Sequence, residues 1–182
     1  WRVSADFYYT NYALTLYICR AYFNRKMRVL KVYLDTSVIG GCFDEEFSAE
    51  SLMLLDRIKS GRYIALISDT TLKELEGAPT EIKNVLKGIP EEYQVEITTT
   101  PEVRTLAQMY ITEKVVPQWC QVDALHIATA AHFGADLLLS WNFKHIVNVG
   151  RIMGYNGINI REGYKSLEIR SPKEVVYDEE EI

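Results

Sequence analysis

The chain has 182 residues, of which 48% are apolar and 25% charged, a length and composition typical of one globular domain. Its formal net charge of -5 excludes a global basic field that attracts nucleic acid, although bound divalent cations can reverse the charge locally. The three cysteines, Cys19, Cys42 and Cys120, form no CxxC pair. This argues against a disulfide framework or a zinc site, and it favours a reducing, cytoplasmic location.

Residues 1–26 differ in composition from the rest, because they hold five of the twelve tyrosines and four basic side chains against one acidic one. Their apolar stretch, Tyr12 to Cys19, is too short for a transmembrane helix. The order of features expected of a signal peptide is missing as well. We therefore expect an extension outside the native domain, which would begin at Met27, and no membrane partner.

The first predicted strand of the domain, Leu30 to Leu34, ends on Asp35-Thr36-Ser37 and is followed by Gly40-Gly41. In an open parallel sheet, ligands bind just outside the carboxyl ends of the strands. Asp35 is therefore a candidate metal ligand or catalytic group. It could equally cap the following turn through its side chain.

Predicted helices and strands alternate along the rest of the chain. Helices are expected at 48–60, 70–75, 80–87, from 100, at 117–133 and at 143–153, and strands at 63–67, 93–97, 137–139 and 158–160. This alternation predicts an α/β domain of three layers, α/β/α, with a central parallel sheet and helices on both faces. We place this domain at residues 27–163 and expect a C-terminal tail at 164–182.

Three further polar residues lie near strand ends. Glu74 is in the first turns of the helix after the second strand, Asp123 starts the helix before the fourth strand, and Asn142 follows that strand. With Asp35, they can all face one edge of a parallel sheet. Carboxylates brought together repel one another without a cation, and oxygen ligands suit Mg²⁺ or Mn²⁺ rather than zinc.

Each of these residues also has a structural interpretation. Glu74 could complete a capping box with Thr71. Asp123 could interact favourably with the helix dipole, and Asn142 could stabilise a turn or cap the next helix. Spacing alone leaves both interpretations open.

Four segments, in this order, resemble the motifs of PIN-domain nucleases: Leu34–Ser37, Ser68–Leu75, Asp123–Ala130 and Leu138–Asn142. They cover roughly residues 29 to 160. The chain is most similar in these motifs to small prokaryotic PIN proteins, which include VapC-type toxins.

The resemblance implies a Mg²⁺- or Mn²⁺-dependent endoribonuclease that hydrolyses RNA phosphodiester bonds. Asp35, Glu74 and Asp123 would be the metal ligands and, with Asn142, the catalytic set. Asn142 stands where many members carry a fourth acid. The resemblance further implies an RNA substrate, a small antitoxin as partner in a type II toxin–antitoxin pair, and a homodimer.

Further residues are candidates for supporting roles. Thr36, Ser37 and Ser140, the last at a hydroxyl position of the family, would hold the ligands by hydrogen bonds. Lys144, Arg151 and Arg161 are the basic side chains that we expect to contact the phosphate backbone of the substrate. We expect His126 to be a packed residue of its apolar helix, and His145 to have a surface role.

Two other functions compete with the nuclease. A non-catalytic PIN-like module that binds RNA or protein is kept open by Asn142, but the three acids argue against it. A phosphatase of the haloacid-dehalogenase type would need a second aspartate two residues after the first, where Ser37 stands.

Overall fold

Five strands form a fully parallel sheet in the order β3-β2-β1-β4-β5. They are β1 (Leu30–Leu34), β2 (Tyr63–Ser68), β3 (Gln94–Ile97), β4 (Leu137–Leu139) and β5 (Glu168–Arg170). The computed structural model describes residues 28–177, so the predicted extension at residues 1–26 lies outside the described residues. β1 is central: Val32 is in register with Ala65 of β2 and with Leu137 of β4.

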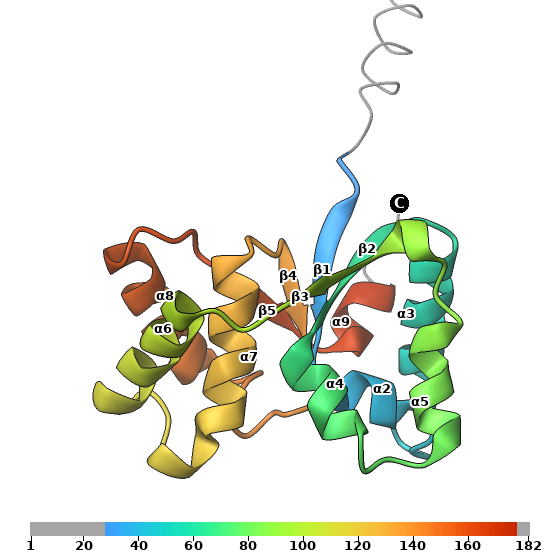
Figure 1. The fold of residues 1–182 in the computed structure, drawn as a ribbon, viewed down its shortest axis with the longest axis horizontal. Coiled ribbons are helices and arrows are strands. Elements are labelled where there is room, and N and C mark those ends of the chain that lie inside the picture. The colour runs from blue at the N-terminus through green and yellow to red at the C-terminus, as the bar shows by residue number, and fades with distance from the viewer. Residues whose placement is uncertain (1–27, 178–182) are drawn as a thin grey trace, which may run out of the picture.

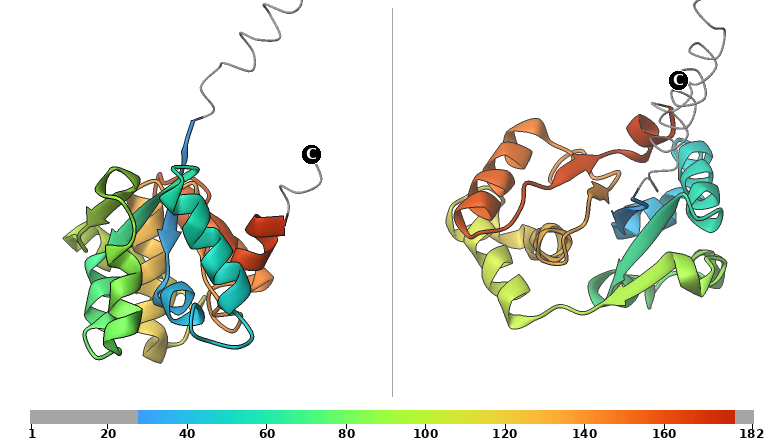
Figure 2. Two further views of the ribbon diagram at one scale, coloured as in Figure 1. Left: turned by 90° about the vertical axis from the view of Figure 1, so that its right-hand side faces the viewer. Right: turned by 90° about the horizontal axis from the view of Figure 1, so that it is seen from above.

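Helices cover both faces of the sheet, which confirms the predicted three-layer α/β/α class (Figures 1 and 2). One layer contains α6 (Pro101–Thr112), α7 (Gln121–His132) and α8 (Val149–Arg161). The other contains α2 (Thr36–Gly41), α3 (Ser48–Lys59), α5 (Thr80–Lys87) and α9 (Pro172–Tyr177). Helix α4 (Asp69–Leu75) packs against both α2 and α7, and two short 3-10 helices, η1 (Glu91–Tyr93) and η2 (Gln118–Cys120), complete the elements.

The alternation of side chains along β1 divides the core between the two layers. Tyr33 packs with the α6, α7 and α8 layer, whereas Val32 and Leu34 pack with the opposite layer. All three are fully buried, as expected for a parallel strand covered on both faces. Among residues 28–177, no helix is both long and apolar enough to cross a membrane.

The C-terminal third of the chain differs from the prediction. Residues 143–148 form turns, and the helix begins at Val149, where Asn148 caps it by accepting a hydrogen bond from the Arg151 amide. The predicted strand at 158–160 is wrong, because these residues lie inside α8. The last strand is β5, which pairs with β4, so the sheet extends beyond the predicted domain boundary at residue 163.

Candidate metal and active site

The order of the strands places a switch point between β1 and β4. From β1 the chain builds the sheet outward through β2 and β3, and it then returns to the other side of β1 to form β4 and β5. In doubly wound sheets, ligands bind at such a switch point, outside the carboxyl ends of the strands. Asp35 leaves β1 here, its amide donating to the Leu139 carbonyl at 3.1 Å, and Ser140 to Asn142 leave β4 beside it.

Hydroxyl groups from both strand ends fix the Asp35 carboxylate. Asp35 is 5% exposed, and its Oδ2 accepts hydrogen bonds from Ser37 Oγ at 2.5 Å and from Ser140 Oγ at 2.8 Å. Ser37 Oγ in turn accepts the Trp141 amide at 2.9 Å. Thr36 holds the second acid, because its Oγ1 donates to Glu74 Oε2 at 2.5 Å. The three residues predicted to orient the ligands therefore contact Asp35 or Glu74.

His126 joins two of the predicted ligands, which the sequence analysis missed. Its Nε2 lies 2.8 Å from Glu74 Oε2 and 3.4 Å from Asp35 Oδ1, and its Nδ1 lies 2.7 Å from the Tyr33 hydroxyl. Potential ligand atoms of Asp35, Glu74 and His126 all lie within 4.8 Å of one another. His126 is buried as expected, but it is more than a packing residue. Its spacing of three from Asp123, which places both on one side of a helix, was the available signal.

The carboxylates and the imidazole stabilise one another's charges. Burial opposes the charged form of His126, but the hydrogen bond to Glu74 and the charge of Asp35 outweigh it and raise the pKa of the imidazole. Burial likewise opposes the charged form of Glu74, but the bonds from His126 and Thr36 lower the pKa of that carboxyl. The cluster therefore carries opposite charges that compensate each other in the absence of a metal ion.

Asp123 and Asn142 form the other half of the site. Asn142 Nδ2 donates to Asp123 Oδ1 at 3.0 Å, and the Asn142 amide donates to Ser140 Oγ at 2.9 Å, the same hydroxyl that bonds Asp35. Burial raises the pKa of Asp123, and the negative charge of Asp35 raises it further. The four predicted residues are thus brought to one edge of the sheet, although Glu74 is joined to the others through His126 and Thr36.

The structural interpretations are partly correct. The capping box for Glu74 is wrong, because Ser68 caps α4 by accepting the Thr71 amide at 3.0 Å. Asn142 does stabilise a turn, since its Oδ1 accepts the His145 amide at 3.0 Å. Asp123 lies in the first turn of α7, where the helix dipole favours a negative charge.

A third group of side chains, Cys120 and His145, lies next to Asp123. Burial raises the pKa of the Cys120 thiol, and the charge of Asp123 adds to this effect, while Arg151 and Lys144 oppose it. Burial lowers the pKa of His145, which is half-buried rather than free at the surface. Arg151 also donates to the Val115 carbonyl at 2.7 Å.

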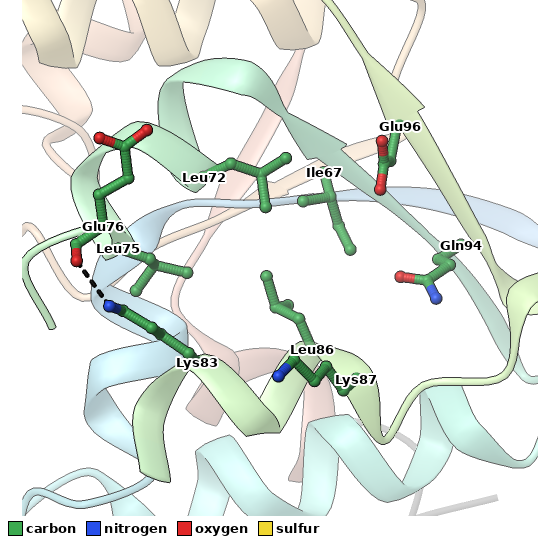
Figure 3. A pocket seen from close by; sticks show the side chains of 9 residues that line it. All are labelled: Ile67, Leu72, Leu75, Glu76, Lys83, Leu86, Lys87, Gln94 and Glu96. Atoms are coloured by element: carbon green, nitrogen blue, oxygen red, sulfur yellow. Dashed lines mark hydrogen bonds between the residues drawn. The ribbon is translucent and has the colours of Figure 1, made fainter. Parts of the chain in front are cut away.

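Two surface grooves differ in their relation to this site. A groove of about 430 Å³ between α4, α5 and β3 is lined by the apolar side chains of Ile67, Leu72, Leu75 and Leu86, and none of the predicted ligands lines it (Figure 3). A smaller groove of about 210 Å³ includes Glu74 itself. Its walls carry two basic side chains, Lys73 and Arg104, and this basic flank was not found from the sequence.

The solved structures that match this chain include two with TM-scores just under 0.5. A chain of VapBC2 from Rickettsia felis, bound to a DNA fragment from its promoter, is 12% identical, with 78% of this chain and 98% of that chain covered and a TM-score of 0.49. A chain of DNA-bound VapBC from Salmonella typhimurium is 17% identical, with 79% and 99% covered and a TM-score of 0.48. No protein-family model matches the sequence, and no curated protein matches it. At this identity and TM-score, neither likeness assigns a function to the chain.

Proposed function

We propose that this protein is a Mg²⁺- or Mn²⁺-dependent endoribonuclease of the PIN type, with Asp35, Glu74 and Asp123 as its metal ligands. The observation that carries the proposal is that Asp35 and Glu74 offer ligand atoms to one cluster beside the switch point of the sheet, while Asp123 is linked to Asp35 through Asn142 and Ser140. Structural acids of a soluble protein are usually dispersed over the surface, whereas a shared cation gives a reason to hold them together.

The donor atoms fit a hard divalent ion. Two of the three potential donors in the Asp35 cluster are carboxylates, as Mg²⁺ and Mn²⁺ require, and the buried His126 could add a nitrogen ligand, which Mn²⁺ accepts more readily than Mg²⁺, only after losing its proton. When bound, such an ion supplies an activated water for in-line attack on a phosphodiester and neutralises the charge that develops on the phosphate.

The side chains around the ligands have separate tasks in this proposal. Ser37 and Ser140 fix the orientation of Asp35 by donating to the same carboxylate oxygen. His126 holds Glu74 toward Asp35, and Asn142 holds Asp123 by donating to one of its oxygens. Outer partners of this kind commonly orient metal ligands and tune their basicity.

The groove beside Glu74 supports a polyanionic substrate. Lys73 and Arg104 bring positive charge to a protein that is acidic overall. The Thr70 hydroxyl, which lies 3.2 Å from that of Thr99 in the same groove, is able to donate to a phosphate or ribose oxygen, whereas the Thr99 hydroxyl donates to Asp69. We therefore propose that RNA passes along this groove toward the acids, with Lys144 and Arg151 as further candidates on the Asp123 side.

The biological context rests on the resemblance of the motifs. We propose on that basis a toxin role, a small antitoxin partner, a homodimer and a cytoplasmic location. Co-expression with the product of a short neighbouring reading frame tests the pairing, since an antitoxin should co-purify with the chain and suppress its RNA cleavage.

The decisive experiment compares two Asp→Asn variants in RNA cleavage with Mn²⁺. Asp35→Asn should lower the rate at least about 100-fold, since even outer partners of a ligand typically cost about 10- to 100-fold. Asp56→Asn is the matched control, because Asp56 lies on the exposed surface of α3 and should keep full activity. Without metal, Asp35→Asn should change the denaturant midpoint little, because the lost attraction to His126 is offset by relief of the repulsion from Asp123. Unchanged cleavage by Asp35→Asn would refute the proposal.

The second candidate is a non-catalytic module that binds RNA or protein. Its specific support is the position of His126, whose imidazole already compensates the charges of Glu74 and Asp35. Under this alternative, RNA binding would be independent of Mn²⁺ and the Asp35→Asn variant would bind as well as the wild type.

A further inference from the structure

Three donors of different chemistry meet at Asp123, in a cluster that does not include Glu74 or Asp35. Cys120 Sγ, a carboxylate oxygen of Asp123 and a ring nitrogen of His145 all lie within 4.8 Å of one another. Cys120 ends η2, Asp123 lies in the first turn of α7, and His145 belongs to the turn after β4. The fold therefore brings together two segments that are more than twenty residues apart in sequence.

The surroundings hold these donors in place. Cys120 is 4% exposed, and the turn that carries His145 is closed by Asn142, whose side chain also bonds Asp123. Among residues 28–177, His145 Nδ1 is the buried side-chain polar atom that has no hydrogen-bond partner. A buried nitrogen without a partner is costly, and a bound ion or water is the usual explanation for one.

We propose that Cys120, Asp123 and His145 form a binding site for a borderline-soft divalent cation such as Zn²⁺. Thiolate and imidazole ligands select zinc over Mg²⁺, and three protein ligands leave a tetrahedral position open. Binding releases the thiol proton to the solvent. The cysteine spacing argued against zinc because it has no CxxC pair, but here the other ligands come from Asp123 and a different turn.

The proposed site shares Asp123 with the proposed nuclease centre, yet it does not require nuclease activity. An ion on this side of Asp123 would be held by sulfur and nitrogen, whereas the Asp35 side offers mainly oxygen. The two positions should therefore discriminate between metals, and they can be tested separately.

Cobalt is the probe, because a thiolate bound to Co²⁺ gives a near-ultraviolet charge-transfer band that oxygen and nitrogen ligands do not give. The titration uses the full chain with Cys19→Ser, after removal of metals with EDTA. We expect the band in this protein, its displacement by Zn²⁺ and no displacement by excess Mg²⁺. His145→Gln should weaken Co²⁺ binding at least about 10-fold.

The two remaining cysteines give a matched pair of variants. Cys120→Ser should abolish the band, whereas Cys42→Ser should keep it, since Cys42 donates to the Val38 carbonyl within its own helical turn and a serine hydroxyl can do the same. Far-ultraviolet circular dichroism verifies that each variant is folded. Absence of the band, or a band that survives in folded Cys120→Ser, overturns the proposal. Asp35→Asn should keep the band while losing RNA cleavage, so failure of one proposal is distinguishable from failure of the other.

Discussion

The two carboxylates beside the buried imidazole of His126 raise its pKa, although burial alone would lower it. In the metal-free protein this coupling makes stability depend on pH. A group whose pKa is raised on folding stabilises the folded state below its unfolded pKa. That stabilisation is lost as the pH rises through the folded value.

We therefore expect the free energy of unfolding, measured in EDTA, to fall as the pH rises from 6.5 upward, by at most about 1.4 kcal/mol per pH unit. The His126→Gln variant should lack this decline, because glutamine does not titrate. Urea titrations at a series of pH values measure the free energy of unfolding of the wild type and of the variant. The lowered pKa of Glu74 acts at acid pH, where its stabilisation is lost as the pH falls through the folded value. Parallel pH profiles of wild type and variant would exclude the coupling.

For single residues, the sequence predicts the acidic ligands better than the side chains that bond to them. Asp35, Asp123 and Asn142 are recognisable because a polar residue at the end of an apolar strand or at a helix start is conspicuous. His126 is less conspicuous. Its spacing of three from Asp123 places it on the same side of the helix, but its neighbours in α7 are apolar, and no local pattern shows that Glu74, 52 residues earlier, bonds its Nε2. Contacts of this range depend on how helices pack, which no local pattern specifies.

Helix α2 illustrates how an element positions the site. It follows Asp35 directly, carries Thr36 and Ser37, which bond the acids, and ends with Gly40 and Gly41. A Cβ on Gly41 would lie 2.8 Å from Ser51 Oγ and 2.9 Å from Trp141 Nε1, two atoms that are hydrogen-bonded to each other. A Cβ on Gly40 would meet nothing within 4 Å.

Substitution of the two glycines by alanine should have different effects on the free energy of unfolding. Gly41→Ala should lower the free energy of unfolding by about 1–3 kcal/mol through overpacking. Gly40→Ala should leave it unchanged or raise it by up to about 1 kcal/mol, because alanine favours the helix. Denaturant titration of both variants measures the difference, and equal effects would mean that Gly41 is not required for the close approach.

The groove between α4, α6 and α7 allows a test of whether Arg104 of α6 contacts RNA. If Arg104 contacts an RNA phosphate, Arg104→Gln should weaken binding of a short single-stranded RNA and reduce the slope of log K against log salt by about 0.7. Arg28→Gln is the control, because Arg28 pairs with Asp136 at the opposite edge of the sheet. Fluorescence anisotropy at several salt concentrations measures the slope for each variant and for the wild type. A slope for Arg104→Gln identical to that of the Arg28→Gln control would exclude Arg104 as a phosphate contact.

Helix α8 shows why the sequence predicted a strand at residues 158–160, where the structure has a helix. Its three glycines, Gly150, Gly154 and Gly157, weaken the helical pattern, and the run Ile158-Asn159-Ile160 looks like an alternating strand. In the structure Gly154 lies close to Val115, and Ile160 is 63% exposed. Packing against α6 therefore stabilises a helix that local propensity does not favour.

For the whole molecule, the two ends of the chain should differ in importance. A chain that begins at Met27 should melt at the same temperature as the full chain, because both core clusters lie between residues 32 and 176.

A chain that ends at residue 163 should not fold, since it loses the buried side chains of Leu167, Ile169 and Val176. Each costs about 2–5 kcal/mol, against a total stability of about 5–15 kcal/mol. Thermal denaturation followed by circular dichroism tests both. Cooperative melting of the shorter chain would show that β5 and α9 are dispensable.

The pairing of β5 with β4 makes residues distant from the acids matter to them. The Ser140 amide donates to the Arg170 carbonyl at 3.2 Å, and the side chain of the same serine holds Asp35. Helix α9 is fastened in turn by Arg57, which donates to the carbonyls of Val175 and Val176. A ligand, tag or modification that detaches β5 and α9 from the rest of the fold would remove the support of Ser140. Asp35 would then lose its fixed orientation, although nothing had contacted the acids directly.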